Sequence, residues 1–240
     1  MAMGAHVIKV GLNPIIINLM EQGIIKAVAM NGAGIIHDFE LAMTGQTSED
    51  VAASIGDGSF GMARETCDFL GQAILKAGKE NIGLGQAVGQ AIIDARLPVA
   101  EKSILAAGAR LNIPVTVHVA IGTDIIHMHP EFNPKEAGGA SYRDFMTFAS
   151  VVSSLDQGVY LNVGSAVILP EVFLKAITLV RNLGHKVEKL TTVNMDFMRH
   201  YRPMTNVVHR PTLEGGKGYN LIGHHEIMFP LIAAGVIEQI

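Results

Sequence analysis

Short apolar runs alternate with longer segments of helical character along most of this chain, and that alternation constrains the fold more than any other feature. Predicted helices at about 103–111, 143–155 and 170–182 are each followed by an apolar run: IPVTVHVA, GVYLNVG and KLTTVNM. Strands that are separated by helices pair in parallel, because their connections cross over in the right-handed sense. The pattern therefore predicts a parallel sheet covered by helices.

The same pattern continues toward both ends of the chain. Asn13-Pro14 begins a predicted helix that ends before Gly23, since Pro favours the first helical turn and Gly the position after the last. Strands are predicted at 25–30 and at GYNLIG, and a closing helix at HEIMFPLIAAGVI. The predicted fold class is α/β, a doubly wound and mostly parallel sheet of about six strands with helices on both faces, forming one domain over 1–240.

Two segments interrupt the alternation. Residues 44–62 are rich in Gly, Ser, Thr and Asp and are predicted to be irregular, as a lid over a site would be. Residues 199–218 are also predicted to be irregular, and they carry the basic residues Arg202, His209 and Arg210. A cationic loop suits a carboxylate or a phosphate group, because Arg binds such groups through two parallel hydrogen bonds.

Composition limits the functional classes. The formal charge is −4 and the basic residues do not cluster, so a nucleic-acid partner is not expected. Apolar runs are interrupted well before the length of a membrane span, so no membrane association is expected. Cys67 is the single cysteine and no leader-like segment is seen, which favours a reducing, cytoplasmic location.

Glycine-rich or polar residues follow nearly every predicted strand. In an open parallel sheet the ligand lies beyond the carboxyl ends of the strands, where glycine lets a pyrophosphate approach the backbone and a helix N-terminus attracts its charge. One such turn is more often only a tight turn, but several on one edge indicate a dinucleotide site, with NAD as the expected cofactor. The residues expected to bind it are Asn31, Gly32, Ala33, Gly34, His37, Asp38, Gly122, Thr123, Asp124, Asn194, Asp196, Gly223 and His224.

Two side chains are candidates for the chemistry. His129 follows the Asp124 turn, and histidine is the side chain most often used for proton transfer near neutral pH. Lys217 lies in a glycine-rich stretch that is flexible enough to carry a nucleophilic amine, although a solvated loop lysine is the simpler interpretation. The histidines also allow a metal site built from His127, His129 and His224, but no cysteine cluster or HExxH helix accompanies them.

Taken in order, five segments resemble deoxyhypusine synthase and its deoxyhypusine-synthase-like relatives over nearly the whole chain. They are GAHVIKVGL, NGAGIIHDFE, NIPVTVHVAIGTDIIHMHPEFNP, NVGSAVILPEVFLKA and HEIMFPLIAA. The resemblance implies a Rossmann-like, NAD-dependent and commonly tetrameric protein. It implies that residues 32–34 line the phosphates or a ribose, that Thr123 and Asp124 lie beside the cofactor, that Asp196 and His224 flank its adenosine or ribose parts, and that His129 accepts a proton.

The resemblance is incomplete at the substrate end of the family site. The family's catalytic lysine follows a Trp-Gly pair, whereas this chain has no tryptophan, and Lys217 matches that lysine only if several residues are deleted. We therefore expect hydride transfer on a small amine or carboxylate-bearing substrate, by a homo-oligomer, with His129 as base. The alternatives are an authentic spermidine-dependent aminobutyl transferase, a non-catalytic nucleotide-binding or assembly protein, and metal-dependent hydrolysis.

Overall fold

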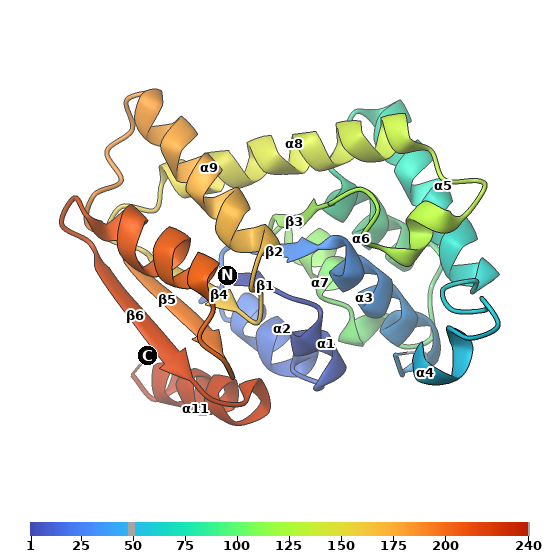
Figure 1. Cartoon of the computed structure of the whole chain (residues 1–240), viewed down its shortest axis with the longest axis horizontal. Coiled ribbons are helices and arrows are strands. Elements are labelled where there is room, and N and C mark those ends of the chain that lie inside the picture. Colours follow the sequence, from blue (N-terminus) through green and yellow to red (C-terminus); the bar gives the residue numbers. More distant parts are fainter. Residues whose placement is uncertain (48–50, 240) are drawn as a thin grey trace.

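The computed structural model describes residues 1–47 and 51–239, which contain a six-stranded sheet with all neighbours parallel (Figure 1). Its strand order is β3-β2-β1-β4-β5-β6, so the direction in which the sheet grows reverses between β1 and β4. The predicted α/β, doubly wound fold class is confirmed. The strands are β1 (Ala2–Met3), β2 (Val28–Asn31), β3 (Val115–His118), β4 (Val159–Val163), β5 (Thr191–Asp196) and β6 (Lys217–Ile222).

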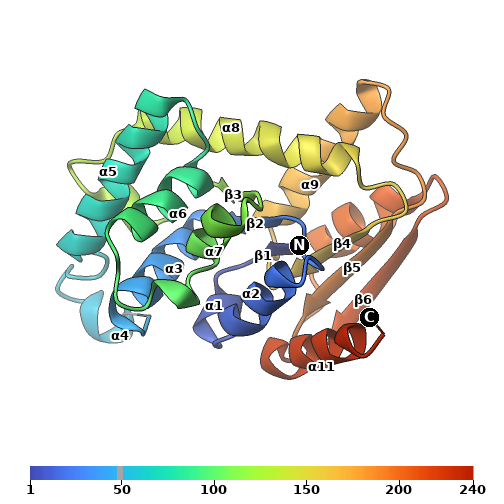
Figure 2. The same ribbon diagram turned by 180° about the vertical axis from the view of Figure 1, so that it is seen from behind.

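Helices connect the strands and cover both faces of the sheet, and α8 runs across the molecule between α5 and α9 (Figure 2). The first half of the chain contributes α1 (His6–Lys9), α2 (Asn13–Glu21), α3 (Gly32–Thr44), α4 (Val51–Ser54), α5 (Arg64–Glu80), α6 (Leu84–Asp94) and α7 (Ile104–Leu111). The second half contributes α8 (Pro134–Ser153), α9 (Ile168–Asn182), α10 (Tyr201–Pro203) and α11 (His225–Ile237). Short turns of other helical types are η1 (Ala100–Lys102), η2 (Ile125–Met128), η3 (Met204–His209) and η4 (Arg210–Thr212).

Alternate residues of the strands build two hydrophobic clusters. Met3 and Met30 face the cluster that contains α2, α3 and α5 to α7, whereas their neighbours Ala2 and Ala29 face the cluster under α9. This is the period of two that a strand imposes on its side chains. The second cluster includes Tyr160, which stacks on a phenylalanine of α9. Strand β3 is buried along its whole length and β2 nearly so, whereas β6 has no buried residue.

Local signals explain where the helices begin. Ser103 caps α7 by accepting a hydrogen bond from the Ala106 amide (3.0 Å), as the predicted start near residue 103 requires. Helix α8 begins earlier than predicted, because Asn133 caps it and Pro134 occupies its first turn. The two-residue strand β1 was not among the predicted strands, although it lies at the centre of the sheet.

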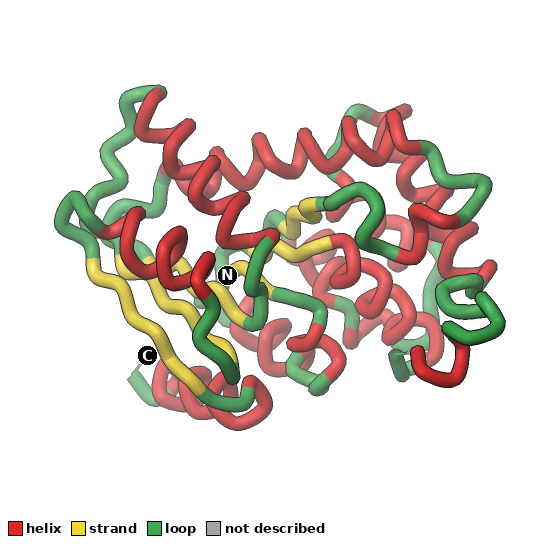
Figure 3. Tube along the Cα trace, viewed as in Figure 1, coloured by secondary structure: helices red, strands yellow, loops and turns green. Residues whose placement is uncertain are grey.

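The prediction that residues 199–218 are irregular is wrong over most of that segment. Residues 201–212 are helical throughout, formed by α10, η3 and η4, and this stretch is the crossover from β5 to β6 (Figure 3). Its prolines lie in turns where a missing amide donor is tolerated. The other irregular segment, 44–62, includes α4, and its residues 48–50 lie outside the described part of the chain. No helix in residues 1–47 and 51–239 is both long and apolar enough to cross a membrane.

Candidate functional site

The crevice between the carboxyl ends of β1 and β4 is where this topology offers a ligand site, because helices leave the sheet toward opposite faces there. Glycine ends both strands. The Gly4 amide donates to the Val163 carbonyl (2.9 Å), and Gly164 has a left-handed φ of 64°. A Cβ atom on Gly4 would overlap the Gly164 carbonyl group. The two backbones therefore approach one another as only glycine allows.

The first turn of α3 continues this edge at the end of β2. The Asn31 side chain caps the helix by accepting a hydrogen bond from the Gly34 amide (3.1 Å). Gly32 and Ala33 lie in the first turn, where backbone amides have no partner within the helix. The carboxylate of Asp124 lies directly against Gly32, so that a Cβ atom there would overlap it. Gly32 is thus required for the close approach of the turn after β3.

Asp124 brings an unsatisfied acceptor to the site. The residue is only 7% exposed, and its Oδ2 atom is buried without a hydrogen-bond partner. Burial raises the pKa of this carboxyl above its ordinary value. The turn is held by His127, whose Nδ1 atom accepts hydrogen bonds from the amides of Gly122 (3.2 Å) and Asp124 (3.1 Å). His127 therefore orients the turn and is not available as a base through that nitrogen.

A pocket of about 180 Å³ joins these elements to the segment predicted as a lid. Ala33, His37, Thr123 and Asp124, four of the predicted cofactor residues, line it together. Val51 and Phe60, from the segment predicted to be a lid, also line this pocket. His37 also pairs with the buried carboxylate of Glu40 (3.0 Å). The full lining is Lys9, Ala33, Ile36, His37, Glu40, Val51, Phe60, Thr123, Asp124 and Ile125.

His225, the first residue of α11, lies at the β1–β4 crevice. The residue is 1% exposed, its Nε2 atom lies 3.3 Å from the Met195 carbonyl, and its Nδ1 atom is buried without a partner. Burial lowers the pKa of this imidazole, against the opposing effect of the nearby Asp196 carboxylate. The ring stands against Gly164, where a Cβ atom would lie 2.8 Å from its Cε1 atom. The His6 ring is 5.5 Å away, between centroids.

Asp196 and His224 complete this part of the edge, and both were predicted from sequence. Asp196 ends β5, is 4% exposed, and lies 3.9 Å from the His200 imidazole. Its Oδ1 atom accepts a hydrogen bond from the Phe197 amide (2.8 Å). Gly223 continues the sheet by donating its amide to the Asp196 carbonyl (3.1 Å), and His224 follows at the surface. The predicted turns after β5 and β6 are therefore neighbours.

Two predicted cofactor residues have other tasks, which corrects their expected role. Asp38 is fully buried, and its carboxylate accepts hydrogen bonds from Asn13, Ser103 and the first amides of α7. It holds α2, α3 and α7 together. Asn194 is also fully buried, in a cross-strand series of hydrogen bonds between Asn162 and Asn220. Neither side chain faces the ligand edge.

His129 and Lys217 are not brought to the crevice. His129 lines a separate pocket of about 530 Å³ on α5, where its Nε2 atom lies 3.9 Å from an Asp68 oxygen. Lys217 is the first residue of β6 and pairs with Thr191, the first residue of β5. It therefore lies at the amino edge of the sheet, roughly 20 Å along the strand from Gly223. The two predicted catalytic residues do not share one site.

Arg202 and Arg210, two of the basic residues of 199–218, also have local partners. Arg202 lies 3.5 Å from Glu171 of α9, and Arg210 donates to the Asn206 side chain (2.9 Å). The Arg202 contact joins the crossover to α9, and the Arg210 contact lies within the crossover. The predicted cationic loop is thus a helical crossover whose Arg202 lies near the first turn of α9.

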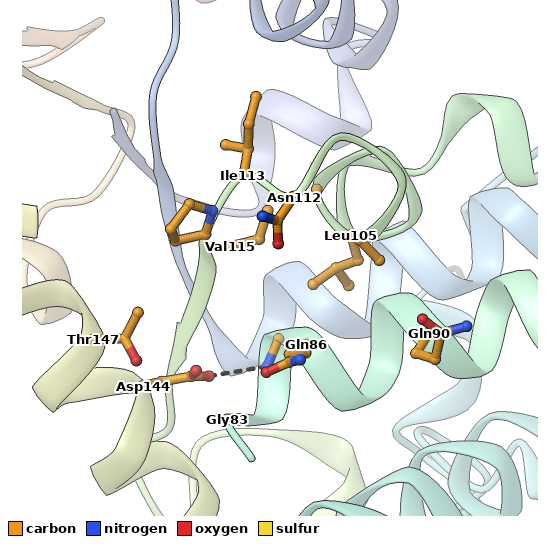
Figure 4. A pocket seen from close by; sticks show the side chains of 13 residues that line it. Gly83, Gln86, Gln90, Leu105, Asn112, Ile113, Val115, Asp144 and Thr147 are labelled. Atoms are coloured by element: carbon orange, nitrogen blue, oxygen red, sulfur yellow. Dashed lines mark hydrogen bonds between the residues drawn. The ribbon is translucent and has the colours of Figure 1, made fainter.

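The pocket in Figure 4 lies at the opposite, amino end of β3, between α6, α7 and α8. Its one ionisable group is Asp144, whose carboxylate accepts hydrogen bonds from the amides of Gly85 (2.9 Å) and Val117 (2.8 Å). Burial raises the pKa of Asp144 to about 7. A carboxylate without a cationic neighbour in the lining does not suit a pyrophosphate, so we place the candidate cofactor site at the carboxyl edge.

Several residues of the crevice were missed as cofactor-site residues by the sequence reasoning. Gly4 and His6 follow β1, whose two residues are too short to produce a strand pattern. Gly164 and His225 were not among the predicted cofactor residues. Within residues 1–47 and 51–239, no group of three or more His, Cys, Asp or Glu side chains is arranged to hold a metal ion. Gly4, two residues before His6, was the sequence signal that could have pointed to this part of the crevice.

The strand order defines a doubly wound, Rossmann-like α/β fold, and the glycine-ended crevice lies at its switch point. No protein-family model and no curated protein matches the chain. Among solved structures, a protein from Methanococcus maripaludis S2 assigned as a LOR/SDH protein is similar, with a TM-score of 0.56, 14% identity, and coverage of 99% of this chain and 62% of that one.

Two further solved structures share the fold. A protein of Entamoeba histolytica assigned as a deoxyhypusine synthase has a TM-score of 0.55 and 13% identity, covering 97% of this chain and 72% of its own. AgrE, solved in a ternary complex with ornithine and NAD⁺, has a TM-score of 0.56 and 14% identity, covering 99% of this chain and 30% of its own. The chain thus spans less than two thirds of the LOR/SDH protein and about a third of AgrE. The deoxyhypusine-synthase-like resemblance is confirmed at the level of the fold.

Proposed function

We propose that this protein binds NAD across the carboxyl edge of its sheet and catalyses hydride transfer on a small substrate that carries an amine or a carboxylate. The observation that carries the proposal is the glycine-ended crevice between β1 and β4, flanked by the orphaned acceptors of Asp124 and His225. The NAD⁺ complex of AgrE, a protein with the same fold, supports it. The chain's own residues can be tested for their fit to this cofactor.

The residues at the end of β2 fit one part of the cofactor, the ribose. The buried Oδ2 atom of Asp124 needs a hydrogen-bond donor, and a ribose hydroxyl group supplies one. A phosphate placed beside this carboxylate would be repelled, so we assign the ribose to Asp124 and the pyrophosphate to the glycines nearer the crevice. From Gly32 to Asp196 the edge crosses three strand spacings, about 14 Å. Such a span suits an extended dinucleotide better than a mononucleotide.

NAD, when bound, supplies the acceptor or donor of the hydride. The protein must then hold the proton that leaves or enters the substrate, and His225 is the imidazole at the crevice. Its contact with the Met195 carbonyl favours the proton on Nε2 and leaves a lone pair on Nδ1. Because burial lowers its pKa, this imidazole stays neutral and able to accept a proton near pH 7. We assign the base role to His225, since His129 lies in another pocket.

A calorimetric titration with NAD tests the proposal. Ala33→Asp places a carboxylate in the first turn of α3, where an acid stabilises the helix while its side chain fills the pocket assigned to the ribose. We expect binding to the unmodified protein and none to this variant. Lys135→Gln is the matched control, because it changes the net charge equally at the 90% exposed first turn of α8 and should bind as the unmodified protein does. Absence of binding to the unmodified protein contradicts the proposal.

The position of Lys217 argues against the alternative function of an aminobutyl transferase. An aminobutyl transferase needs a lysine at the reacting atoms, whereas Lys217 lies at the amino edge of the sheet. Incubation with spermidine and NAD, followed by borohydride, should therefore trap no adduct on Lys217, and a trapped adduct would support the transferase. A non-catalytic NAD-binding protein remains the second candidate, and it predicts binding without reduction of the cofactor by any amine or carboxylate tested.

A further inference from the structure

Phe197, the residue after β5, exposes an aromatic ring at the carboxyl edge. It is 49% exposed, although a phenylalanine is ordinarily among the most buried residue types. Its backbone is fixed, because its amide donates to the Asp196 carboxylate (2.8 Å). Single exposed apolar residues are common and by themselves indicate nothing. The surroundings of this ring are what distinguish it.

Imidazoles from separate parts of the chain surround the Phe197 ring. The His224 ring is nearly parallel to it, at an interplanar angle of 10° and a centroid distance of 6.4 Å. His225 is also 6.4 Å away, edge-on at 75°, and His6 is 6.3 Å away, tilted at 56°. These residues come from the start of α1, the turn after β6 and the start of α11. Every one of these elements begins at the carboxyl edge.

This cluster also has an unsatisfied polar atom. His225 is 1% exposed, and its Nδ1 atom has no partner. Gly164 lies against the same ring, since a Cβ atom there would be 2.8 Å from Cε1 of His225. A flat, half-exposed aromatic surface beside a buried acceptor is an arrangement that a planar ring with hydrogen-bond donors can use.

We infer that Phe197, with His224 and His6 around it, forms a stacking platform for a planar heteroaromatic ring of the bound dinucleotide. The inference rests on the proposed function and adds where one end of the cofactor lies. Adenine and nicotinamide share the required chemistry, a flat π-face with ring or amide nitrogens. Stacking of a base on an aromatic side chain changes affinity by about 5- to 150-fold when the side chain is replaced by alanine.

Two substitutions at this position test the platform. Phe197→Ala should weaken NAD binding about 5- to 150-fold in a calorimetric titration. Phe197→Trp should retain binding, because the larger ring still stacks. The chain contains no tryptophan, so this variant carries a single indole fluorophore at the platform. Its emission should be quenched by NAD. Tyr142→Trp is the matched control, since residue 142 is 64% exposed on α8 and should report no quenching.

AMP and nicotinamide mononucleotide then identify the ring, because only the fragment that stacks on the platform quenches the Phe197→Trp emission. If NAD binds the unmodified protein but Phe197→Ala binds it equally well, the platform is refuted and the proposed function stands. If the unmodified protein binds no NAD, the proposed function fails. In that case quenching by either fragment supports the platform, and no quenching by both overturns it.

Discussion

Gly164→Ala is the substitution that probes the geometry of the crevice most sharply. Gly164 has a φ of 64°, and an alanine in that region costs about 1–2 kcal/mol. The new Cβ atom would also lie 2.8 Å from Cε1 of His225, a ring that is buried and cannot move into solvent. Overpacking of this kind typically costs a further 1–3 kcal/mol. We expect the free energy of unfolding to fall by about 2–5 kcal/mol in total.

Gly11→Ala is the control that measures the cost of the left-handed backbone conformation alone. Gly11 has a φ of 77° but no atom within 4 Å of its Cβ position, so only the cost of about 1–2 kcal/mol applies. Urea unfolding at an unchanged m-value measures both variants. In a His225→Ala background the cost of Gly164→Ala should fall to that of Gly11→Ala. Equal costs for the two glycine variants in the unmodified background, or a cost that His225→Ala leaves unchanged, would refute the contact.

Three other predictions concern ionisable groups. Burial raises the pKa of Asp144 from 3.8 to about 7, so the folded state holds its proton more tightly and the free energy of unfolding should decline as pH rises between these values; Asp144→Asn should remove that decline in urea titrations, and a parallel profile would contradict the assignment. Burial lowers the pKa of His225, so its contribution to stability should be lost as pH falls below the ordinary histidine value of about 6.5, and its Cε1 proton resonance should still report a neutral ring at that pH. Burial raises the pKa of the Cys67 thiol, which is 3% exposed, so an aromatic disulfide reagent should modify it far more slowly in the folded protein than in urea; equal rates would show that the thiol is accessible.

Most helices and strands could be predicted from the sequence because they have strong local signals. The helix from Asn13 and the helix after Ser103 were predicted because their caps and prolines are local features. Strand β1 was missed because two residues cannot display a periodicity, and its place at the centre of the sheet depends on pairing with β2 and β4. The helical crossover at 201–212 was missed because Pro and Gly dominated the pattern.

The candidate site was predicted in part for the same reason. Glycine turns after strands are visible in a sequence, and the structure brings Gly32 and Asp124 together as expected. The direction of a side chain is not visible in this way. Asp38 turns inward to cap α7, and His129 turns toward α5, because partners distant in sequence offer them hydrogen bonds or charge. The crevice residue His225 depends on the packing of α11, which no local pattern encodes.

Hydrogen–deuterium exchange with and without NAD tests the central claim most directly, because it reads the whole chain at once. The dinucleotide is predicted to protect the segments that follow the strands at the carboxyl edge, at about residues 31–36, 121–125, 164–169 and 196–198. Protection confined to the pocket at the amino end of β3, between Gly83 and Gln90, or no protection at saturating NAD, would contradict the account.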